Sequence, residues 1–166
     1  MAHSAVLLAG GRSSRMGRDK PGLIFDGKPL WRHQLATLRA TQPAELFISG
    51  AADGCYADAG IPVIPDDAPG LGPLGGIATA LRRCTGEPLL VLAVDMPMMT
   101  PDFLRSLLDE SRRTGKGVIP VVLARGLAAA PWTRQRSPNL VATLGDSIAA
   151  ALYLDSQYNN TGARSQ

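Results

Sequence analysis

The chain has 166 residues, of which 45% are hydrophobic and 19% are charged, and 17 basic against 14 acidic residues give it a net charge of +3. This balance excludes a disordered polymer and suffices for one domain with a single buried core. Because aromatic residues make up only 5%, the basic excess favours one local anion site over a nucleic-acid surface, which needs a broad basic face and aromatic stacking platforms.

Membrane, secretion and metal-cage signals are missing from the sequence. No apolar run approaches 18 residues, and the first residues lack a basic segment followed by an apolar one and a cleavage site. We therefore expect a cytoplasmic protein that binds neither membrane nor nucleic acid. Cys55, Cys84, His3 and His33 have no metal-ligand spacing, so each is expected to be a packing or surface residue.

The first predicted strand is the apolar run that leads into a loop "GGRSSRMGRDK" at 10–20. Gly10 and Gly11 lack a Cβ, so the chain can adopt positive φ there and bring its N–H groups close to a ligand. Four cations follow within nine positions: Arg12, Arg15, Arg18 and Lys20. Backbone amides together with this charge predict a polyphosphate site.

Two well-known glycine motifs do not fit this loop. A Walker A loop needs four residues between its glycines and then Lys-Ser or Lys-Thr, whereas five residues separate Gly11 from Gly17 and Arg18 follows. A dinucleotide fingerprint is also missing at this strand end. The alternative is a solvated glycine turn with surface arginines, and the density of cations favours the anion site.

Strand-like runs then alternate with helix-like stretches along the chain. Strands are predicted at 5–9, 45–49, 61–65, 88–94 and 117–122, and helices at 29–41, 74–84 and 100–115. In the first helix, one face is predicted to be apolar (Leu30, Trp31, Leu35, Leu38) and the other polar (Arg32, Gln34, Arg39). This alternation predicts an α/β fold of three layers, a mostly parallel sheet with helices on both faces.

Helix boundaries are marked most clearly in the third helical stretch. Thr100 is a suitable N-cap, Pro101 suits the first helical position, and Gly115 suits the end of the helix. In the second stretch, Pro73 is predicted to start the helix.

The segment 70–75 spells G-x-G-x-x-G, but it does not directly follow a strand and contains Pro73, so we reject a dinucleotide site there. Gly75 and Gly76 leave the first turn of the following helix uncovered, which would let a flat or charged group lie against it. Crowding against another element is the structural alternative for these glycines.

Asp95 follows the most apolar predicted strand. In parallel sheets ligands bind at the carboxyl ends of the strands, so this carboxylate is placed to hold Mg²⁺ that bridges phosphate oxygens. A turn-capping role before Pro97 is the alternative, and the basic loop expected at the same edge favours the metal role.

Three segments in this order, "LLAGGRSSRMGRDK", "VIPDDAPGLGPLGGI" and "LAVDMP", resemble the molybdenum cofactor guanylyltransferase family of Rossmann-like nucleotidyltransferases. The resemblance covers residues 4 to about 122. It implies transfer of GMP from GTP to molybdenum-bound molybdopterin, with Mg²⁺ as cofactor and with other proteins of molybdenum cofactor biosynthesis as partners. Related cytidylyltransferases tend to have L-A-A-G in the first loop and lack P-L-x-G, so this chain resembles the guanine-specific branch.

The same resemblance implies the roles of individual residues. Leu8, Ala9, Gly10 and Gly11 would wrap the nucleotide, Arg15 and Lys20 would neutralise its triphosphate, and Asp66, with Gly75 nearby, would help to recognise the guanosine. Asp95 would bind Mg²⁺.

We expect residues 1–166 to form a single domain whose part from about 123 to 166 is atypical for the family, because strand and helix patterns are hard to follow there. The resemblance implies that this region would help to hold the acceptor, so two further functions stay open. One is a nucleotide-binding protein with a degenerate acceptor site that acts as a partner or regulator. The other is a nucleotidyltransferase for a different phosphorylated acceptor.

Overall fold

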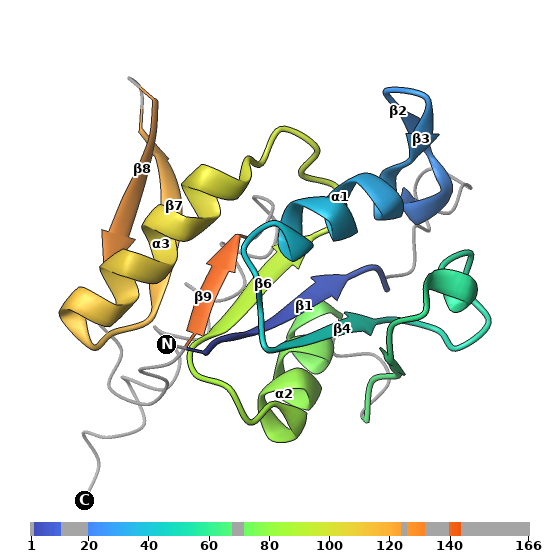
Figure 1. The fold of residues 1–166 in the computed structure, drawn as a ribbon, viewed down its shortest axis with the longest axis horizontal. Coiled ribbons are helices and arrows are strands. Elements are labelled where there is room, and N and C mark those ends of the chain that lie inside the picture. Colours follow the sequence, from blue (N-terminus) through green and yellow to red (C-terminus); the bar gives the residue numbers. More distant parts are fainter. Residues whose placement is uncertain (1, 11–19, 68–71, 124–125, 132–139, 144–166) are drawn as a thin grey trace, which may run out of the picture.

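The computed structural model describes residues 2–10, 20–67, 72–123, 126–131 and 140–143, and it has a central sheet with helices on both faces (Figure 1). The strand order is β5-β4-β1-β6-β9-β7-β8. The strands of this sheet are β1 (Ser4–Leu8), β4 (Glu45–Ser49), β5 (Val63–Ile64), β6 (Leu89–Ala93), β7 (Val118–Leu123), β8 (Gly126–Pro131) and β9 (Leu140–Thr143). All neighbouring pairs are parallel except β7 and β8.

The helices are α1 (Leu30–Arg39), α2 (Pro73–Arg83) and α3 (Pro101–Thr114), with 3-10 turns η1 (Lys20–Gly22) and η2 (Ala57–Ala59). A two-stranded hairpin of β2 (Ile24–Phe25) and β3 (Lys28–Pro29) precedes α1. The predicted α/β architecture is confirmed, and the predicted strands and helices agree with the structure to within one or two residues at most ends.

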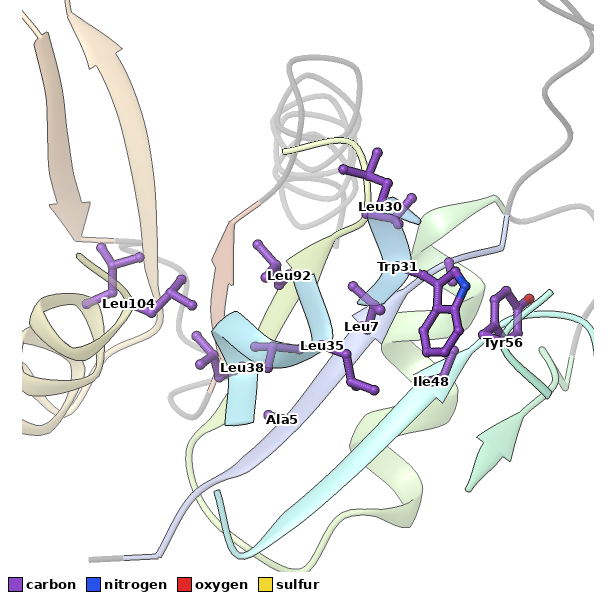
Figure 2. Close-up of a cluster of buried hydrophobic side chains, with 14 of the residues drawn as sticks. Ala5, Leu7, Leu30, Trp31, Leu35, Leu38, Ile48, Tyr56, Leu92 and Leu104 are labelled. Carbon is purple, nitrogen blue, oxygen red and sulfur yellow. The ribbon is translucent and has the colours of Figure 1, made fainter. Parts of the chain in front are cut away.

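Alternate residues of the central strands pack into two separate cores. Ala5 and Leu7 of β1 contribute to a core with α1 and α3, whereas Val6 and Leu8 contribute to a second core with α2. Figure 2 shows Leu7 in the first of these cores, together with Leu35 and Leu38 of α1. Both faces of β1 and β6 are therefore buried, which explains their unbroken apolar sequence.

Helix α3 begins and ends at the predicted residues. The Thr100 side chain accepts a hydrogen bond from the Phe103 amide at 3.2 Å, Pro101 occupies the first turn, and Gly115 adopts the left-handed conformation with φ 63°. Pro73 likewise starts α2. Cap chemistry therefore fixed these boundaries as expected.

One predicted helix face is wrong. Gln34 was assigned to the polar face of α1, but its side chain is fully buried. It lies four residues from both Leu30 and Leu38, so helical geometry places it in the apolar stripe. Arg32 and Arg39 are exposed, as predicted.

His3, Cys55 and Cys84 occupy the packing or surface positions expected from the sequence. His3 is buried, its ring hydrogen-bonds Thr41 Oγ1 at 3.1 Å, and burial lowers its pKa. Cys55 is exposed and Cys84 is half-buried, and neither forms a disulfide. Within the part of the chain that the structure describes, no helix combines the length and apolar character needed to cross a bilayer.

Glu45 ties together the amino ends of β1, β4 and β6. Its carboxylate accepts hydrogen bonds from Ser4 Oγ (2.5 Å), from the amide and hydroxyl of Thr85 (both 2.8 Å) and from the Gly86 amide (3.2 Å). These donors, led by Ser4, lower the pKa of Glu45 to about 2. The loop before β6 is thus anchored on β4, which lies on the other side of β1 from β6.

Replacing Glu45 with glutamine should lower the free energy of unfolding by about 1–2 kcal/mol at pH 7, because several charge-assisted hydrogen bonds are lost at a partly solvated site. The native pKa is depressed, so this stabilisation is complete above the unfolded value near 4.5 and disappears as the pH falls towards 2. Urea unfolding of parent and variant at pH 7 and pH 3 measures the difference.

The control is Glu110→Gln, which breaks an exposed ion pair with Arg113 and should change stability much less. An equal loss in both variants, or a Glu45→Gln effect that grows as the pH falls, would contradict the role given to Glu45.

Candidate functional site

The predicted site residues of the described chain gather at the carboxyl edge of the sheet. Leu8 is the last residue of β1, Asp66 follows β5, and Asp95 follows β6 after one intervening residue. Lys20 lies in η1 and reaches the same edge. This is the edge at which open α/β sheets bind their ligands.

Lys20 and Asp95 form an ion pair across 75 positions of sequence. Lys20 Nζ lies 3.2 Å from Asp95 Oδ2, and the two side chains are 42% and 43% exposed. The sequence singled out these residues separately, and the structure brings them into contact. Because the pair is open to solvent, a ligand can reach both charges.

The backbone around Asp95 is held by β1 and α1. The Val94 amide donates to the Leu8 carbonyl at 3.0 Å. From α1, Gln34 Nε2 donates to the carbonyls of Ala93 (3.3 Å) and Met96 (2.6 Å).

The neighbouring His33 Nε2 donates to the Pro97 carbonyl at 3.0 Å. Neither Gln34 nor His33 was predicted from the sequence to lie at this edge. A polar residue in the apolar stripe of α1 was the signal that could have revealed Gln34.

The sequence permits a positive φ at Gly10, but the structure does not use it. Its φ does not lie in the left-handed region, and its amide donates to the Ser49 carbonyl at 3.0 Å, as does the Ala9 amide at 2.9 Å. Glycine is needed for a close approach instead, since a Cβ at Gly10 would lie 3.1 Å from Gly50 Cα. These two amides are therefore committed to the protein, and a nucleotide would have to contact other atoms of Ala9 and Gly10.

Asp66 is oriented by a buried serine. Ser49 Oγ donates to Asp66 Oδ1 at 3.3 Å. A Cβ at Gly76 would fall 2.2 Å from Ser49 Oγ and 3.3 Å from Leu8 Cδ2, so the crowding alternative holds at that glycine. Gly75 is buried in the first turn of α2, and its amide donates to the Gly72 carbonyl at 3.0 Å. The start of α2 thus packs directly against the ends of β1 and β4, beside Asp66.

The residue after Asp66 fixes this loop to α2. The Asp67 amide donates to Thr79 Oγ1 at 3.2 Å, and its carboxylate pairs with Arg82 (2.7 Å) and Arg83 (3.4 Å). The hydrogen bond from Arg82 is the main cause that lowers the pKa of Asp67. Of the two neighbouring aspartates, only Asp67 pairs with arginines of α2 in the described part of the chain, so the Asp66 carboxylate is not engaged by them.

Gly11 and Arg15 lie outside the described residues, as do Arg12 and Arg18. The roles predicted for them from the sequence therefore stay predictions.

In the described part of the chain, Asp95 does not belong to a ready-made cluster of protein metal ligands. Among the residues that the structure describes, no three or more His, Cys, Asp or Glu side chains lie together so that they could hold a metal ion. A closed protein cage is thus not formed by them. One carboxylate nevertheless fits a hard cation that takes its remaining ligands from phosphate oxygens and water.

The profile of the MobA-like NTP transferase domain matches residues 5–159. A probable molybdenum cofactor guanylyltransferase of Methanothermobacter thermautotrophicus is 36% identical over 124 residues, which cover 72% of this chain and 63% of that protein. A molybdenum cofactor guanylyltransferase of Xanthomonas euvesicatoria pv. vesicatoria is 40% identical over 110 residues, which cover 66% of this chain and 55% of the relative. The chain thus spans little more than half the length of these relatives.

Among solved structures, that of Rv0371C from Mycobacterium tuberculosis H37Rv in complex with manganese is similar, with a TM-score of 0.61. The similarity covers 93% of this chain and 84% of that chain at 22% identity. At this identity the similarity shows the shared fold.

Proposed function

The chain belongs to the family of MobA-like NTP transferase domains, and from this membership we propose that it transfers GMP from GTP to the terminal phosphate of molybdenum-bound molybdopterin. The names of the relatives, molybdenum cofactor guanylyltransferases, support this substrate pair. The observation that carries the proposal is the contact of Lys20 with Asp95 at the carboxyl edge of the sheet, where β1 and β6 end. A cation there suits the phosphates of a nucleoside triphosphate, and a carboxylate suits the metal ion that accompanies them.

In the proposed reaction an oxygen of the acceptor's terminal phosphate attacks the α-phosphorus of GTP. The bond between the α-phosphorus and the bridging oxygen breaks, and pyrophosphate leaves with the electron pair. Such a step needs positioned reactants and neutralised charge, and it needs no covalent nucleophile from the enzyme.

We assign the nucleotide to the edge formed by β1, β5 and α2. Leu8 to Gly11 would line the nucleotide, and Arg15 and Lys20 would neutralise the triphosphate. Asp66 would accept hydrogen bonds from the guanine base, with Ser49 holding its carboxylate and Gly75 nearby.

Asp95 would hold a divalent metal ion together with the triphosphate, and Mg²⁺ is the ion proposed. Mg²⁺ is commonly bound through one or two carboxylates plus substrate phosphates, and the half-exposed Asp95 carboxylate fits that role. When bound, the ion supplies positive charge that stabilises the departing pyrophosphate. Lys20, which contacts Asp95, would complement it by donating to phosphate oxygens.

We also propose that residues 1–166 form a single nucleotidyltransferase domain, which the profile match over residues 5–159 supports. Binding of the acceptor is assigned to the part from about 123 onward, of which β8 and β9 are described.

GTP with Mg²⁺ should raise the unfolding temperature more than CTP or ATP does. Binding to the native state alone adds about 2.7 kcal/mol at a hundredfold excess over Kd, which corresponds to about 5–10 °C for a chain of this size. Thermal-shift measurements with the three nucleotides test this expectation. Equal shifts from GTP and CTP would contradict the guanine assignment.

Release of pyrophosphate from GTP, measured with and without molybdenum-loaded molybdopterin, tests the reaction itself. We expect release that depends on the acceptor. Binding of GTP without release would favour a partner or regulator with a degenerate acceptor site, and release with another phosphorylated acceptor only would favour a different transferase.

A further inference from the structure

The loop that carries Asp95 is held by two adjacent side chains of α1. Gln34 has no exposed surface and lies within the apolar stripe of its helix. Its Nε2 group has two protons, and both are used, one on the Ala93 carbonyl and one on the Met96 carbonyl. A single amide thus joins the end of β6 to the loop on the far side of Asp95.

His33 extends this contact by one residue. Its Nε2 donates to the Pro97 carbonyl at 3.0 Å, and its ring meets Phe25 edge-on with the centroids 5.0 Å apart. The aromatic contact limits the rotation of the imidazole, so the hydrogen bond to Pro97 has a fixed direction.

A buried amide at position 34 is not what the core itself would select. Among the described residues, Gln34 Oε1 accepts no hydrogen bond, and a buried acceptor without a partner is unfavourable. Methionine or leucine would fill the same space without that penalty. The hydrogen bonds from Gln34 Nε2 to the loop that carries Asp95 explain why a polar side chain occupies this position.

We propose that Gln34 and His33 are positioning residues that fix the Asp95 carboxylate at the carboxyl edge. With the Val94 amide bonded to Leu8, the chain is anchored at the 93–94 peptide group before Asp95 and at the Met96 carbonyl after it, while the Asp95 carboxylate stays half exposed. Residues that support a metal-binding side chain orient its ligand atoms. The inference rests on the proposed function as far as the metal is concerned, whereas the bracing of the loop can be tested alone.

The test replaces Gln34 with methionine, which keeps the volume and removes both donors. Amide hydrogen exchange at residues 94–99 of the protein without ligand should become at least tenfold faster, with the unfolding temperature little changed because an unpaired buried acceptor is removed at the same time. Mn²⁺ binding in the presence of GTP, followed by the electron paramagnetic resonance signal of free Mn²⁺, should weaken about tenfold.

His33 provides a rescue experiment. In His33→Gln the amide Nε2 can take the place of the imidazole Nε2, so exchange at 94–99 and Mn²⁺ binding should stay near those of the parent. His33→Leu removes the donor and should behave like Gln34→Met. A general packing defect would affect His33→Gln and His33→Leu alike, and that result would overturn the inference.

Thr37→Val is the matched control, since Thr37 is also buried in α1 but its hydroxyl bonds the His33 carbonyl within the helix. It should leave exchange at 94–99 unchanged. Unchanged exchange in Gln34→Met overturns the bracing, and faster exchange with parental Mn²⁺ binding overturns its link to the metal. If the parent itself binds no Mn²⁺ with GTP, the proposed function and the metal link fail together, while the exchange data still decide the bracing.

Discussion

If the chain catalyses the proposed guanylyl transfer, replacing Asp95 with asparagine should reduce the metal-dependent rate by about 10²–10³-fold while the unfolding temperature stays close to that of the parent. Asparagine keeps the shape of the side chain and suits the same turn, but it removes the negative charge that a hard cation prefers. Metal stabilisation of a phosphoryl transition state is worth several kcal/mol, and each 1.4 kcal/mol is about tenfold in rate. Transfer rates at saturating Mg²⁺ and GTP measure the loss.

Asp102→Asn is the matched control, because Asp102 is an exposed carboxylate that also pairs with a cation, Arg105, but lies on α3. It should leave transfer unchanged. If Asp95 only caps its turn, Asp95→Asn is nearly silent, so rates within a few-fold of the parent would contradict the metal role.

The sheet could be predicted because its central strands are buried on both faces. Ala5 to Leu8 and Leu89 to Ala93 form unbroken apolar runs, and helix α3 after the second run carries clear cap residues, Thr100 and Gly115. Strands β8 and β9 were not predicted. In β8, four of the six residues are glycine or alanine, whose small side chains give no alternating pattern, and β9 is only four residues long.

The site was predictable as a set of residues at one edge, but its contacts were not. Chain order places Lys20 and Asp95 at strand ends, yet nothing in the sequence fixes the 3.2 Å distance between them. Gln34 was misplaced because its polarity outweighed its position in the stripe of Leu30 and Leu38. Ser49 gave no signal, since its hydrogen bond to Asp66 depends on how β4 and β5 pair.

Replacing Lys20 with alanine should weaken GTP binding by about 10–100-fold, since a charge-assisted contact to the triphosphate is worth roughly 1.5–3 kcal/mol. The fold should be unaffected, because the ion pair with Asp95 is well exposed and such pairs contribute little to stability. Calorimetric titration with GTP and Mg²⁺ measures the binding, and Lys28→Ala, an exposed lysine of β3, controls for the change in net charge.

The same variant should bind Mn²⁺ more tightly when no nucleotide is present. Lys20 Nζ lies 3.2 Å from Asp95 Oδ2, so the ammonium competes with any cation that approaches this carboxylate. When a triphosphate is bound, both Lys20 and the metal ion are attracted to its phosphates and no longer compete for Asp95. Lys20→Ala is therefore expected to weaken GTP binding but to strengthen Mn²⁺ binding without nucleotide. A folding defect would weaken the binding of both GTP and Mn²⁺. Unchanged GTP affinity in Lys20→Ala, or equal losses in Lys20→Ala and Lys28→Ala, would instead make Lys20 an ordinary surface lysine.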